Sequence, residues 1–208
     1  SRSLSRSSFR VSRRAEQPLT LRSEQSGRAS GLSRFLFCTL DLALAMSDFE
    51  RIIGKLGEAN VRYLIVGGVA VVLHGYQRLT ADLDLIVALD EDNLRATMKA
   101  LGDLGFRPRA PVNMLDFVDA AVRQTWISEK GLTVFSLWSE QHPSTEIDIF
   151  AEYPIDFDGA YSRSVTALIG HHSIHFASID DLVTMKRAAG RPKDLLDIEE
   201  LLRIKDSS

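Results

Sequence analysis

The apolar and polar positions in the middle of the chain predict a strand, a helix and a second strand in close succession. Residues 63–66 form a short apolar run that ends at glycine, which is typical of a buried strand. Residues 69–74 are predicted to be helical, although two adjacent valines favour helices only weakly. Residues 83–89 form the next apolar run and predict the second strand. Gly67 and Gly68 therefore lie in the turn between the first strand and the helix.

The rest of the chain alternates further predicted helices and strands. Apolar residues at helical spacing predict a helix from Phe49 to Ala59, and Asp90 is a suitable N-cap for a helix that ends near Leu104. Further along we expect a loop at 107–119, strands at 122–128, 133–138, 145–150 and 173–177, and a hairpin turn at 129–131.

Two helices are expected at the C-terminal end of the chain. Ser178, with Asp181 three residues later, resembles a capping box and begins a helix that carries Lys186. Gly190 and Pro192 separate this helix from a last one over residues 193–204. Helices mixed with neighbouring strands predict an α/β (α+β) fold in which helices pack on a mixed sheet.

A Gly-Gly turn that begins a helix is a candidate phosphate site. Its backbone N–H groups lie at the positive end of the helix dipole. Asp82 and Asp84 begin the following strand, and side chains at i and i+2 point to the same side of a strand. Two such carboxylates repel each other unless a cation lies between them. Mg²⁺ is the usual cation, because it prefers hard oxygen ligands and substrate phosphates.

A third carboxylate completes the candidate site. Residues 145–150 alternate polar and apolar side chains, so Asp148 lies on a half-buried strand that can pair with the strand of Asp82 and Asp84. Three carboxylates on neighbouring strands can hold two divalent ions about 4 Å apart for displacement at phosphorus. Each feature alone has a simpler explanation, because such aspartates are common in solvated loops and Gly-Gly is often only a turn. Their joint occurrence in this order favours an active site.

At these residues the chain resembles the nucleotidyltransferase superfamily with a DNA polymerase β-like palm. The residues that carry the resemblance are Gly67, Gly68, Arg78, Thr80, Asp82, Asp84 and Asp148. The closer resemblance is to the AbiEii/AbiGii branch, the minimal nucleotidyltransferase toxins of type IV toxin–antitoxin systems. That branch continues with a lysine on a helix and a Lys-Asp-x-x-Asp-like segment, which match Lys186 and residues 193–197 here. The resemblance covers about residues 49–204.

The resemblance implies an enzyme that moves a nucleotide from an NTP to an acceptor hydroxyl with Mg²⁺ or Mn²⁺. It implies metal binding by Asp82, Asp84 and Asp148 and nucleotide binding by Gly67, Gly68, Arg78 and Thr80, and it adds Lys186 and Asp194 to the catalytic set. Many members of the superfamily carry Gly-Ser where this chain has Gly-Gly. The role that position 68 keeps is therefore a backbone role.

The acceptor is left open by the resemblance. It is a tRNA 3′ end, a protein hydroxyl or a small molecule such as an aminoglycoside, and a toxin acting on tRNA would have a cognate antitoxin as its partner. A net charge of −8 over residues 46–208 does not favour tRNA binding, unless Arg187, Arg191 and Lys193 form a local basic patch. A non-catalytic, antitoxin-like module of the same fold is the alternative from another class. The presence of all three carboxylates argues against it.

Several charged residues near the C-terminus also allow a purely structural interpretation. Lys186 is either a solvated lysine beside Arg187 or, as the resemblance implies, a cation on the triphosphate. Asp194 and Asp197 share one helix face, and Lys193 can pair with Asp197 at i+4 on the surface. The resemblance favours Asp194 as a site residue and leaves Asp197 less certain.

Composition limits the class of protein. The chain has 208 residues, of which 45% are hydrophobic, enough for one domain with its own core. Cys38 is the single cysteine, which excludes an internal disulfide and a multi-cysteine zinc site and fits a cytoplasmic location. His171, His172 and His175 lie in a hairpin-like pattern, so a structural role is favoured over metal binding.

Charge is distributed unevenly along the chain. Residues 1–45 hold eight Arg, no Lys and three acidic residues, a net charge of +5. This basic leader is rich in Ser and Arg and is expected to be disordered. Residues 35–46 are apolar but too few to cross a membrane, so no membrane partner is expected.

The leader has three interpretations: a signal peptide, an organellar transit peptide, or an overextended gene model with Met46 as the true start. We favour the third, because the domain pattern begins directly after Met46. The expected nucleotidyltransferase-like domain is then residues 46–208.

Overall fold

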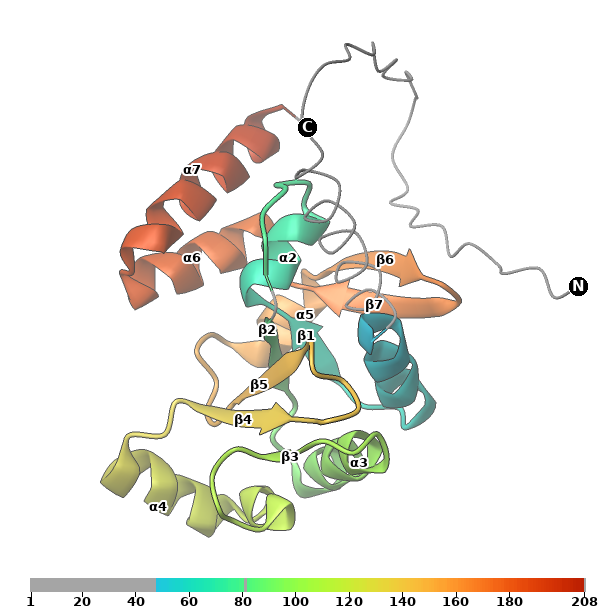
Figure 1. Cartoon of the computed structure of the whole chain (residues 1–208). Coiled ribbons are helices and arrows are strands. Elements are labelled where there is room, and N and C mark those ends of the chain that lie inside the picture. The colour runs from blue at the N-terminus through green and yellow to red at the C-terminus, as the bar shows by residue number, and fades with distance from the viewer. Residues whose placement is uncertain (1–47, 81, 208) are drawn as a thin grey trace, which may run out of the picture.

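The computed structural model describes residues 48–80 and 82–207. These residues form a seven-stranded mixed sheet with the strand order β3-β4-β5-β2-β1-β7-β6 (Figure 1). Its strands are β1 (Tyr63–Ile65), β2 (Asp82–Val87), β3 (Arg107–Pro108), β4 (Val134–Trp138), β5 (Glu146–Phe150), β6 (Val165–Ile169) and β7 (His172–Phe176). The pairs β2–β5 and β1–β7 are parallel, and the other neighbouring strands are antiparallel. The predicted α/β fold with a mixed sheet is confirmed.

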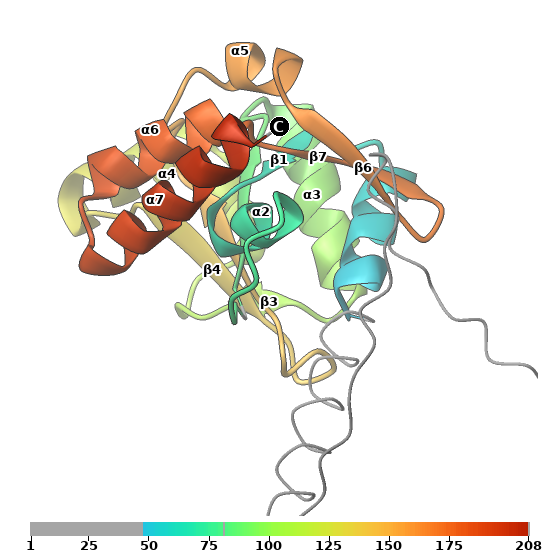
Figure 2. The same cartoon turned by 90° about the horizontal axis from the view of Figure 1, so that it is seen from above.

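Helices surround this sheet. The first is helical from residue 48 to residue 58 in the described part of the chain. It is followed by α2 (Gly67–Leu73), α3 (Glu91–Asp103), a 3₁₀ helix (Met114–Val118), α4 (Ala120–Lys130), α5 (Phe157–Ser162), α6 (Ile179–Ala189) and α7 (Pro192–Asp206). α6 and α7 lie side by side as an antiparallel pair next to α2, and α3 lies away from them (Figures 1 and 2).

The alternation of residues in β2 and β5 separates the core from a polar face. Leu83 and Leu85 in β2 are buried, as are Ile147 and Ile149 in β5. Because side chains alternate across a strand, the aspartates between these residues point to the opposite face. That polar face is where the candidate site lies.

The predicted helix caps are confirmed at two helices. The Asp90 side chain accepts a hydrogen bond from the Asn93 N–H at 2.9 Å at the start of α3. The Ser178 hydroxyl oxygen accepts one from the Asp181 N–H at 3.2 Å at the start of α6. Gly190 ends α6 in the left-handed conformation with φ 62°, and Pro192 begins α7.

The predicted strand over residues 122–128 is wrong, because this segment lies within α4. The Asp119 side chain caps the helix by accepting hydrogen bonds from Ala121 N–H at 2.8 Å and Val122 N–H at 3.2 Å. Gly131, predicted to lie in a hairpin turn, instead ends the helix with φ 64°. The two caps and the i, i+4 spacing of Val122 and Trp126 outweigh the β-branched residues that favoured a strand.

Other departures from the predicted elements are smaller. The expected loop over 107–119 contains the two-residue strand β3 and the 3₁₀ helix. α5 and β6 were not predicted, although β6 supplies the first strand of the hairpin expected around the histidines. The predictions for the basic leader fall on residues outside the described part of the chain.

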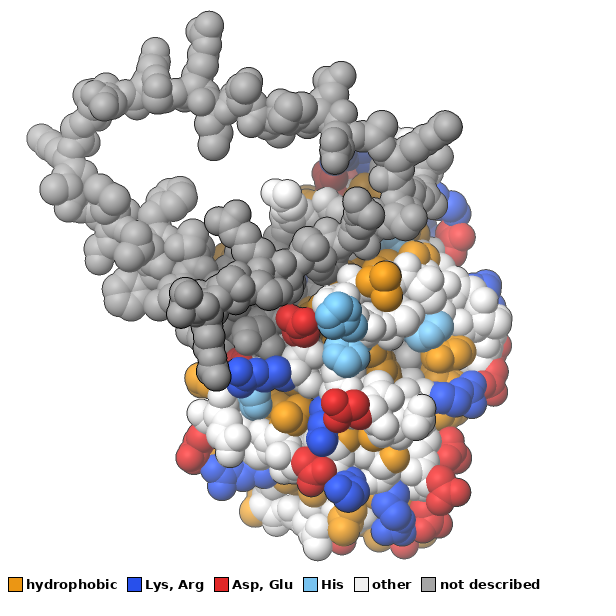
Figure 3. Space-filling view, turned by 90° about the vertical axis from the view of Figure 1, so that its right-hand side faces the viewer, with side chains coloured by type: hydrophobic (Ala, Val, Ile, Leu, Met, Phe, Trp, Pro, Cys, Tyr) orange, Lys and Arg blue, Asp and Glu red, His pale blue; other side chains and the backbone are white. Residues whose placement is uncertain are grey.

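The surface of the described residues carries mixed charges. On the face shown in Figure 3, Lys and Arg side chains are interspersed with Asp and Glu side chains. Within residues 48–80 and 82–207, no helix is both long and apolar enough to cross a membrane.

Candidate active site

The Gly67-Gly68 turn lies directly against the carboxylate of Asp84. Gly67 has φ +62°, a conformation that residues with a side chain rarely adopt, and a Cβ there would clash with Asp84 Oδ2. The Gly68 backbone N–H donates a hydrogen bond to the Asp84 carboxylate. Val66 N–H donates to the Asp84 carbonyl oxygen at 3.0 Å, which joins the turn to β2. Glycine at position 67 is therefore what allows the turn to approach Asp84.

The segment that follows α2 returns over the same turn. A Cβ at Gly68 would clash with the Thr80 hydroxyl and would press against the Arg78 guanidinium. Both of these predicted nucleotide-binding side chains therefore lie beside Gly68. The close approach gives a physical reason for glycine at this position.

The parallel pairing of β2 and β5 places the predicted carboxylates side by side. Asp84 is the register partner of Asp148, and Asp82 is the partner of Glu146. Neighbouring strands lie about 4.8 Å apart, and in-register side chains share a face. The expectation that the strand of Asp148 pairs with that of the other two aspartates is confirmed. Arg109 Nη2 bonds Glu146 Oε2 at 2.7 Å and offsets the charge of this additional carboxylate.

Burial and like charges raise the pKa values of two of these aspartates. Burial is the larger cause at Asp84, followed by the nearby charge of Asp148, and together they raise its pKa to about 6. Burial also raises the pKa of Asp148, although a hydrogen bond from Ser136 Oγ at 2.6 Å opposes this. Ser136 was not predicted, but it is the register partner of Asp148 on β4.

The donor set of these carboxylates fits a divalent cation. Asp82, Asp84 and Asp148 supply hard oxygen atoms, and the negative charges of Asp82 and Asp148 both raise the pKa of Asp84. In the part of the chain that the structure describes, no group of three or more His, Cys, Asp or Glu side chains is arranged to hold a metal ion. Asp84 faces the Gly67-Gly68 turn, and Asp148 bonds Ser136. Joint coordination therefore requires these side chains to turn toward each other.

All nine predicted site residues line one cleft of about 650 Å³ between the sheet and the α6–α7 pair. The polar part of the cleft is lined by Gly67, Gly68, Arg78, Thr80, Asp82, Asp84, Asp148, Lys186, Arg191, Lys193 and Asp194. The apolar part is lined by Val134, Phe150, Pro154, Leu182, Met185, Ala188 and Ala189. Charged and apolar side chains thus both line the cleft.

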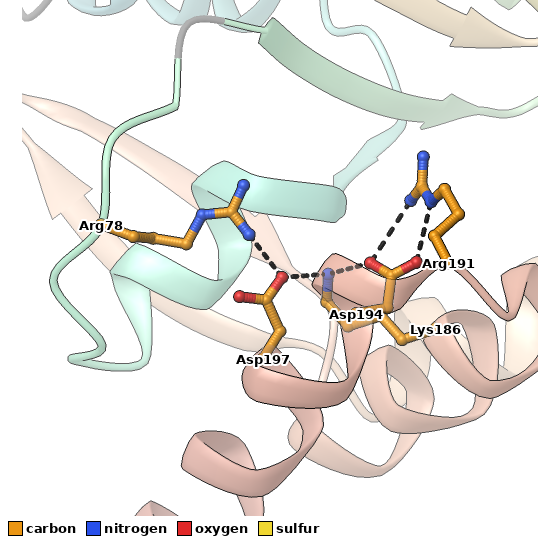
Figure 4. A network of polar contacts seen from close by, with 5 residues as sticks. All are labelled: Arg78, Lys186, Arg191, Asp194 and Asp197. Atoms are coloured by element: carbon orange, nitrogen blue, oxygen red, sulfur yellow. Dashed lines mark hydrogen bonds and ion pairs between the residues drawn. The ribbon is translucent and has the colours of Figure 1, made fainter.

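Five charged residues form one network along the α6–α7 side of this cleft (Figure 4). Lys186 Nζ donates to Asp197 Oδ2 at 2.6 Å and to Asp194 Oδ1 at 3.1 Å. Arg78 donates to the same Asp197 oxygen, and Arg191 Nε donates to Asp194 Oδ2 at 2.8 Å. The Lys186 side chain is only 6% exposed, so the interpretation of Lys186 as a solvated lysine is wrong.

The two aspartates of the network have lowered pKa values. Burial alone would raise the pKa of Asp194 and of Asp197, but the hydrogen bonds of their cationic partners lower both below the ordinary value of 3.8. Asp197 accepts from Lys186 and Arg78, where the sequence suggested a surface pair with Lys193. The network ties the segment after α2 to α6 and α7.

Histidines of β7 and at the end of α2 make packing and hydrogen-bonding contacts within the fold. His172 and His175 lie on β7, which pairs with β6 in the expected hairpin. The His175 ring lies within 3.0 Å of Ser164 Oγ and stacks on Tyr161, and burial lowers its pKa. His74 lies at the C-cap of α2 and packs edge-on against Phe176.

Solved structures with similar folds include several nucleotidyltransferases. One is the lincosamide antibiotic adenylyltransferase LnuA with lincomycin bound, at 18% identity, a TM-score of 0.48, and coverage of 82% of this chain and 96% of that chain. Another is ANT(2″)-Ia in complex with adenylyl-2″-tobramycin, at 14% identity, a TM-score of 0.48, and coverage of 78% and 95%. A third is an antigenic nucleotidyltransferase-like protein from Paracoccidioides brasiliensis, at 16% identity, a TM-score of 0.45, and coverage of 77% and 74%.

The sequence comparisons give the family. No curated protein matches the chain. The family match supports a nucleotidyltransferase, while the narrower AbiEii/AbiGii assignment is not shown. A model of nucleotidyltransferases of unknown function, DUF6036, matches residues 46–206, and the chain belongs to this family.

Proposed function

We propose that the chain transfers a nucleotide from an NTP to an acceptor hydroxyl and releases pyrophosphate. The observation that carries this proposal is the register of Asp84 with Asp148 on parallel strands, directly beside the Gly67-Gly68 turn and within one cleft. A phosphate chain in this cleft would have carboxylates on the sheet side and cations on the helix side. This distribution of charge suits the transfer of a phosphoryl-linked group.

Asp82, Asp84 and Asp148 are the residues that would hold divalent ions, Mg²⁺ or Mn²⁺. Bound ions of this kind lower the pKa of an attacking hydroxyl and offset charge on the leaving pyrophosphate. Asp148 lies at the register position next to Asp84 and is the carboxylate that we propose accepts the proton of the acceptor hydroxyl. Ser136, through its bond to Asp148 Oδ1, orients this carboxylate.

The turn and the segment after α2 bind the phosphates. Gly67 and Gly68 let the turn lie against Asp84 and Thr80, because a Cβ at either glycine would clash with these side chains. The Gly68 N–H already bonds Asp84, so its first contribution is to hold this carboxylate in the cleft. The Thr80 hydroxyl and the Arg78 guanidinium lie next to Gly68 and add donors.

The apolar part of the cleft would receive the nucleobase or an apolar region of the acceptor. Phe150 follows Asp148 by two residues on β5, so both side chains point to the same face of the sheet. Met185 and Leu182 on α6 also line this region. An aromatic base buries apolar area against such residues, whereas a polar acceptor gains little.

The identity of the acceptor separates the variants of this proposal. An antibiotic or other small molecule, a protein hydroxyl and a tRNA 3′ end are three acceptors for the same chemistry, and the tRNA case corresponds to a toxin with a cognate antitoxin. The net charge of −8 over residues 46–208 favours the first two acceptors over tRNA.

The test is transfer of label from each of the four α-³²P-labelled NTPs with Mg²⁺ or Mn²⁺. Total tRNA, lysate protein and an aminoglycoside or lincosamide are offered separately as acceptors. Asp84→Asn is compared with Asp103→Asn, a matched change at an exposed residue of α3. We expect labelled product from the wild type and from Asp103→Asn, and none from Asp84→Asn. Equal transfer by the wild type and Asp84→Asn would refute the assignment of the site.

A further inference from the structure

We infer that Arg191, held in place by Asp194, is a cation of the α6–α7 side that contacts the triphosphate, and that Lys186 is a positioning residue. This inference rests on the proposed function and identifies a residue that binds the phosphate chain. It departs from the expectation that Lys186 itself binds the triphosphate.

The contacts of Lys186 are already made within the protein. Its ammonium donates to Asp197 at 2.6 Å and to Asp194 at 3.1 Å, and the two carboxylate side chains are only 3% and 2% exposed. Moving the ammonium to a phosphate would leave two buried carboxylates without their central cation. Breaking a buried ion pair in this way is strongly destabilising, because it leaves an uncompensated buried charge. Lys186 therefore holds the two aspartates and, through them, the two helices.

Arg191 has the opposite surroundings. Its side chain is 57% exposed and lines the cleft, although it bonds Asp194 through Nε at 2.8 Å. A guanidinium carries five N–H donors, and the contact of its Nη2 with Asp194 is long, at 3.5 Å. Figure 4 shows the guanidinium extending beyond the carboxylate of Asp194, with a nitrogen atom directed away from it. Arg191 is thus anchored at one edge and has donors left for a ligand.

The charge balance of the network points to the same residue. Arg78, Lys186 and Arg191 share two carboxylates, those of Asp194 and Asp197, so the five residues together carry one excess positive charge. The Arg78 side chain is 24% exposed and that of Lys186 6%, which makes Arg191 the most accessible of the three cations. An anion in the cleft would therefore contact the excess positive charge at Arg191.

Arg191 also lies within electrostatic reach of the carboxylate side of the cleft. Both residues line the same cleft, and the pKa of Arg191 is raised chiefly by its hydrogen bond to Asp194, with a smaller contribution from the charge of Asp84. A phosphate chain placed between these two residues would have its metal-binding carboxylate on one side and a cation on the other. Arginine suits this position because its planar fork can donate two parallel hydrogen bonds to a phosphate.

The experiment measures binding apart from catalysis. The affinities of α,β-methylene-ATP and of AMP are measured by calorimetry with Mg²⁺ for the wild type and for Arg191→Ala, Arg191→Lys and Arg187→Ala. Arg187 precedes Ala188 on α6 and does not line the cleft, so it controls for the loss of one positive charge. We expect Arg191→Ala to weaken the triphosphate analogue about 10- to 100-fold, which corresponds to the loss of a charge-assisted hydrogen bond. AMP affinity should stay within about twofold, and Arg191→Lys should be intermediate.

Lys186 is tested by its effect on the fold. We expect Lys186→Met to lower the melting temperature, while Arg191→Ala leaves it nearly unchanged because Asp194 keeps its bond to Lys186. Lys186→Arg, which retains the charge, serves if Lys186→Met does not fold. Lys186→Arg should then bind α,β-methylene-ATP with an affinity closer to that of the wild type than Arg191→Ala does.

Two results separate this inference from the proposed function. If the wild type transfers nucleotides but Arg191→Ala binds the analogue as tightly as the wild type does, the inference is wrong and the proposed function stands. If the wild type binds the analogue no more tightly than AMP and transfers no label, both are wrong.

Discussion

At the scale of single residues, Asp84 is the side chain that contacts the glycine turn and also lies beside the second strand of the site. Its carboxylate accepts from Gly68, faces Gly67 and lies in register with Asp148. Sequence spacing was enough to suggest Gly67, Gly68 and Asp84, because glycines next to a strand end and alternating aspartates are visible in the printed sequence. Asp148 was suggested only on the condition that its strand pairs with that of Asp84. Ser136 was missed, since a serine in a strand gives no signal until its partner strand is known.

Asp84→Asn should remove activity and yet stabilise the fold. Burial and the charge of Asp148 raise the pKa of Asp84 to about 6, so the ionised carboxylate destabilises the folded state at neutral pH. With a chelator present, we expect a gain in unfolding free energy on the order of 1–3 kcal/mol in urea denaturation. Nucleotide transfer should fall by at least about 100-fold. A loss of stability in this variant would mean that the carboxylate makes favourable contacts that outweigh the repulsion.

Gly67→Ala should damage both the fold and the site. Gly67 has a positive φ and no room for a Cβ beside Asp84, whereas Gly131 has nearly the same φ with nothing within 4 Å. Gly131→Ala therefore measures the backbone cost alone, about 1–2 kcal/mol. We expect Gly67→Ala to cost about 1–3 kcal/mol more and to abolish transfer, because Asp84 must move. Equal unfolding free energies for the two variants would show that the carboxylate can shift without penalty.

At the scale of secondary structure, capping residues indicate whether a segment is helical where the pattern of apolar residues is ambiguous. α3 and α6 were predicted from Asp90 and Ser178, and both caps are formed. α4 was mistaken for a strand because its β-branched and aromatic residues were weighed above the cap at Asp119 and the glycine at 131. Short segments of this kind fit both the helical and the strand periodicity of apolar residues, so the residues at their ends are the more useful signal.

The α6–α7 pair should lose stability in acid through its buried aspartates. Asp197 has a lowered pKa in the folded protein, so its contribution is present above the ordinary value of 3.8 and is lost as the pH falls through the lower folded value. At pH 7 we expect Asp197→Asn to lower the unfolding free energy by about 3 kcal/mol, because Lys186 and Arg78 lose a shared partner. The difference from the wild type should shrink below about pH 4.

The matched control for this change is Asp206→Asn at the exposed end of the same helix. Its unfolding free energy should follow that of the wild type across the same pH range. A difference between Asp197→Asn and wild type that stays constant from pH 7 to pH 3 would show that the network contributes through packing and not through charge.

At the scale of the whole molecule, the order of strands is what the sequence could not provide. The fold class followed from the mixture of helices and strands, but β2 and β5 are neighbours although about sixty residues separate them. Their pairing decides that Asp148 meets Asp84, and the chain between them gives no local sign of it. The buried network of Lys186 likewise depends on how α6, α7 and the segment after α2 pack together.

Deleting residues 1–45 should leave the stability and the activity of the domain unchanged. Residues 1–34 lack the periodic apolar side chains that would repay the entropy of ordering them. The first helix of the described residues is held to the rest of the domain by Asp48, whose buried carboxylate lies 2.7 Å from His142 Nδ1. The measurement is thermal melting and NTP transfer for the protein that begins at Met46, compared with the full chain at equal ionic strength. A melting temperature lower by several degrees, or lost transfer, would show that the basic leader contributes to the domain.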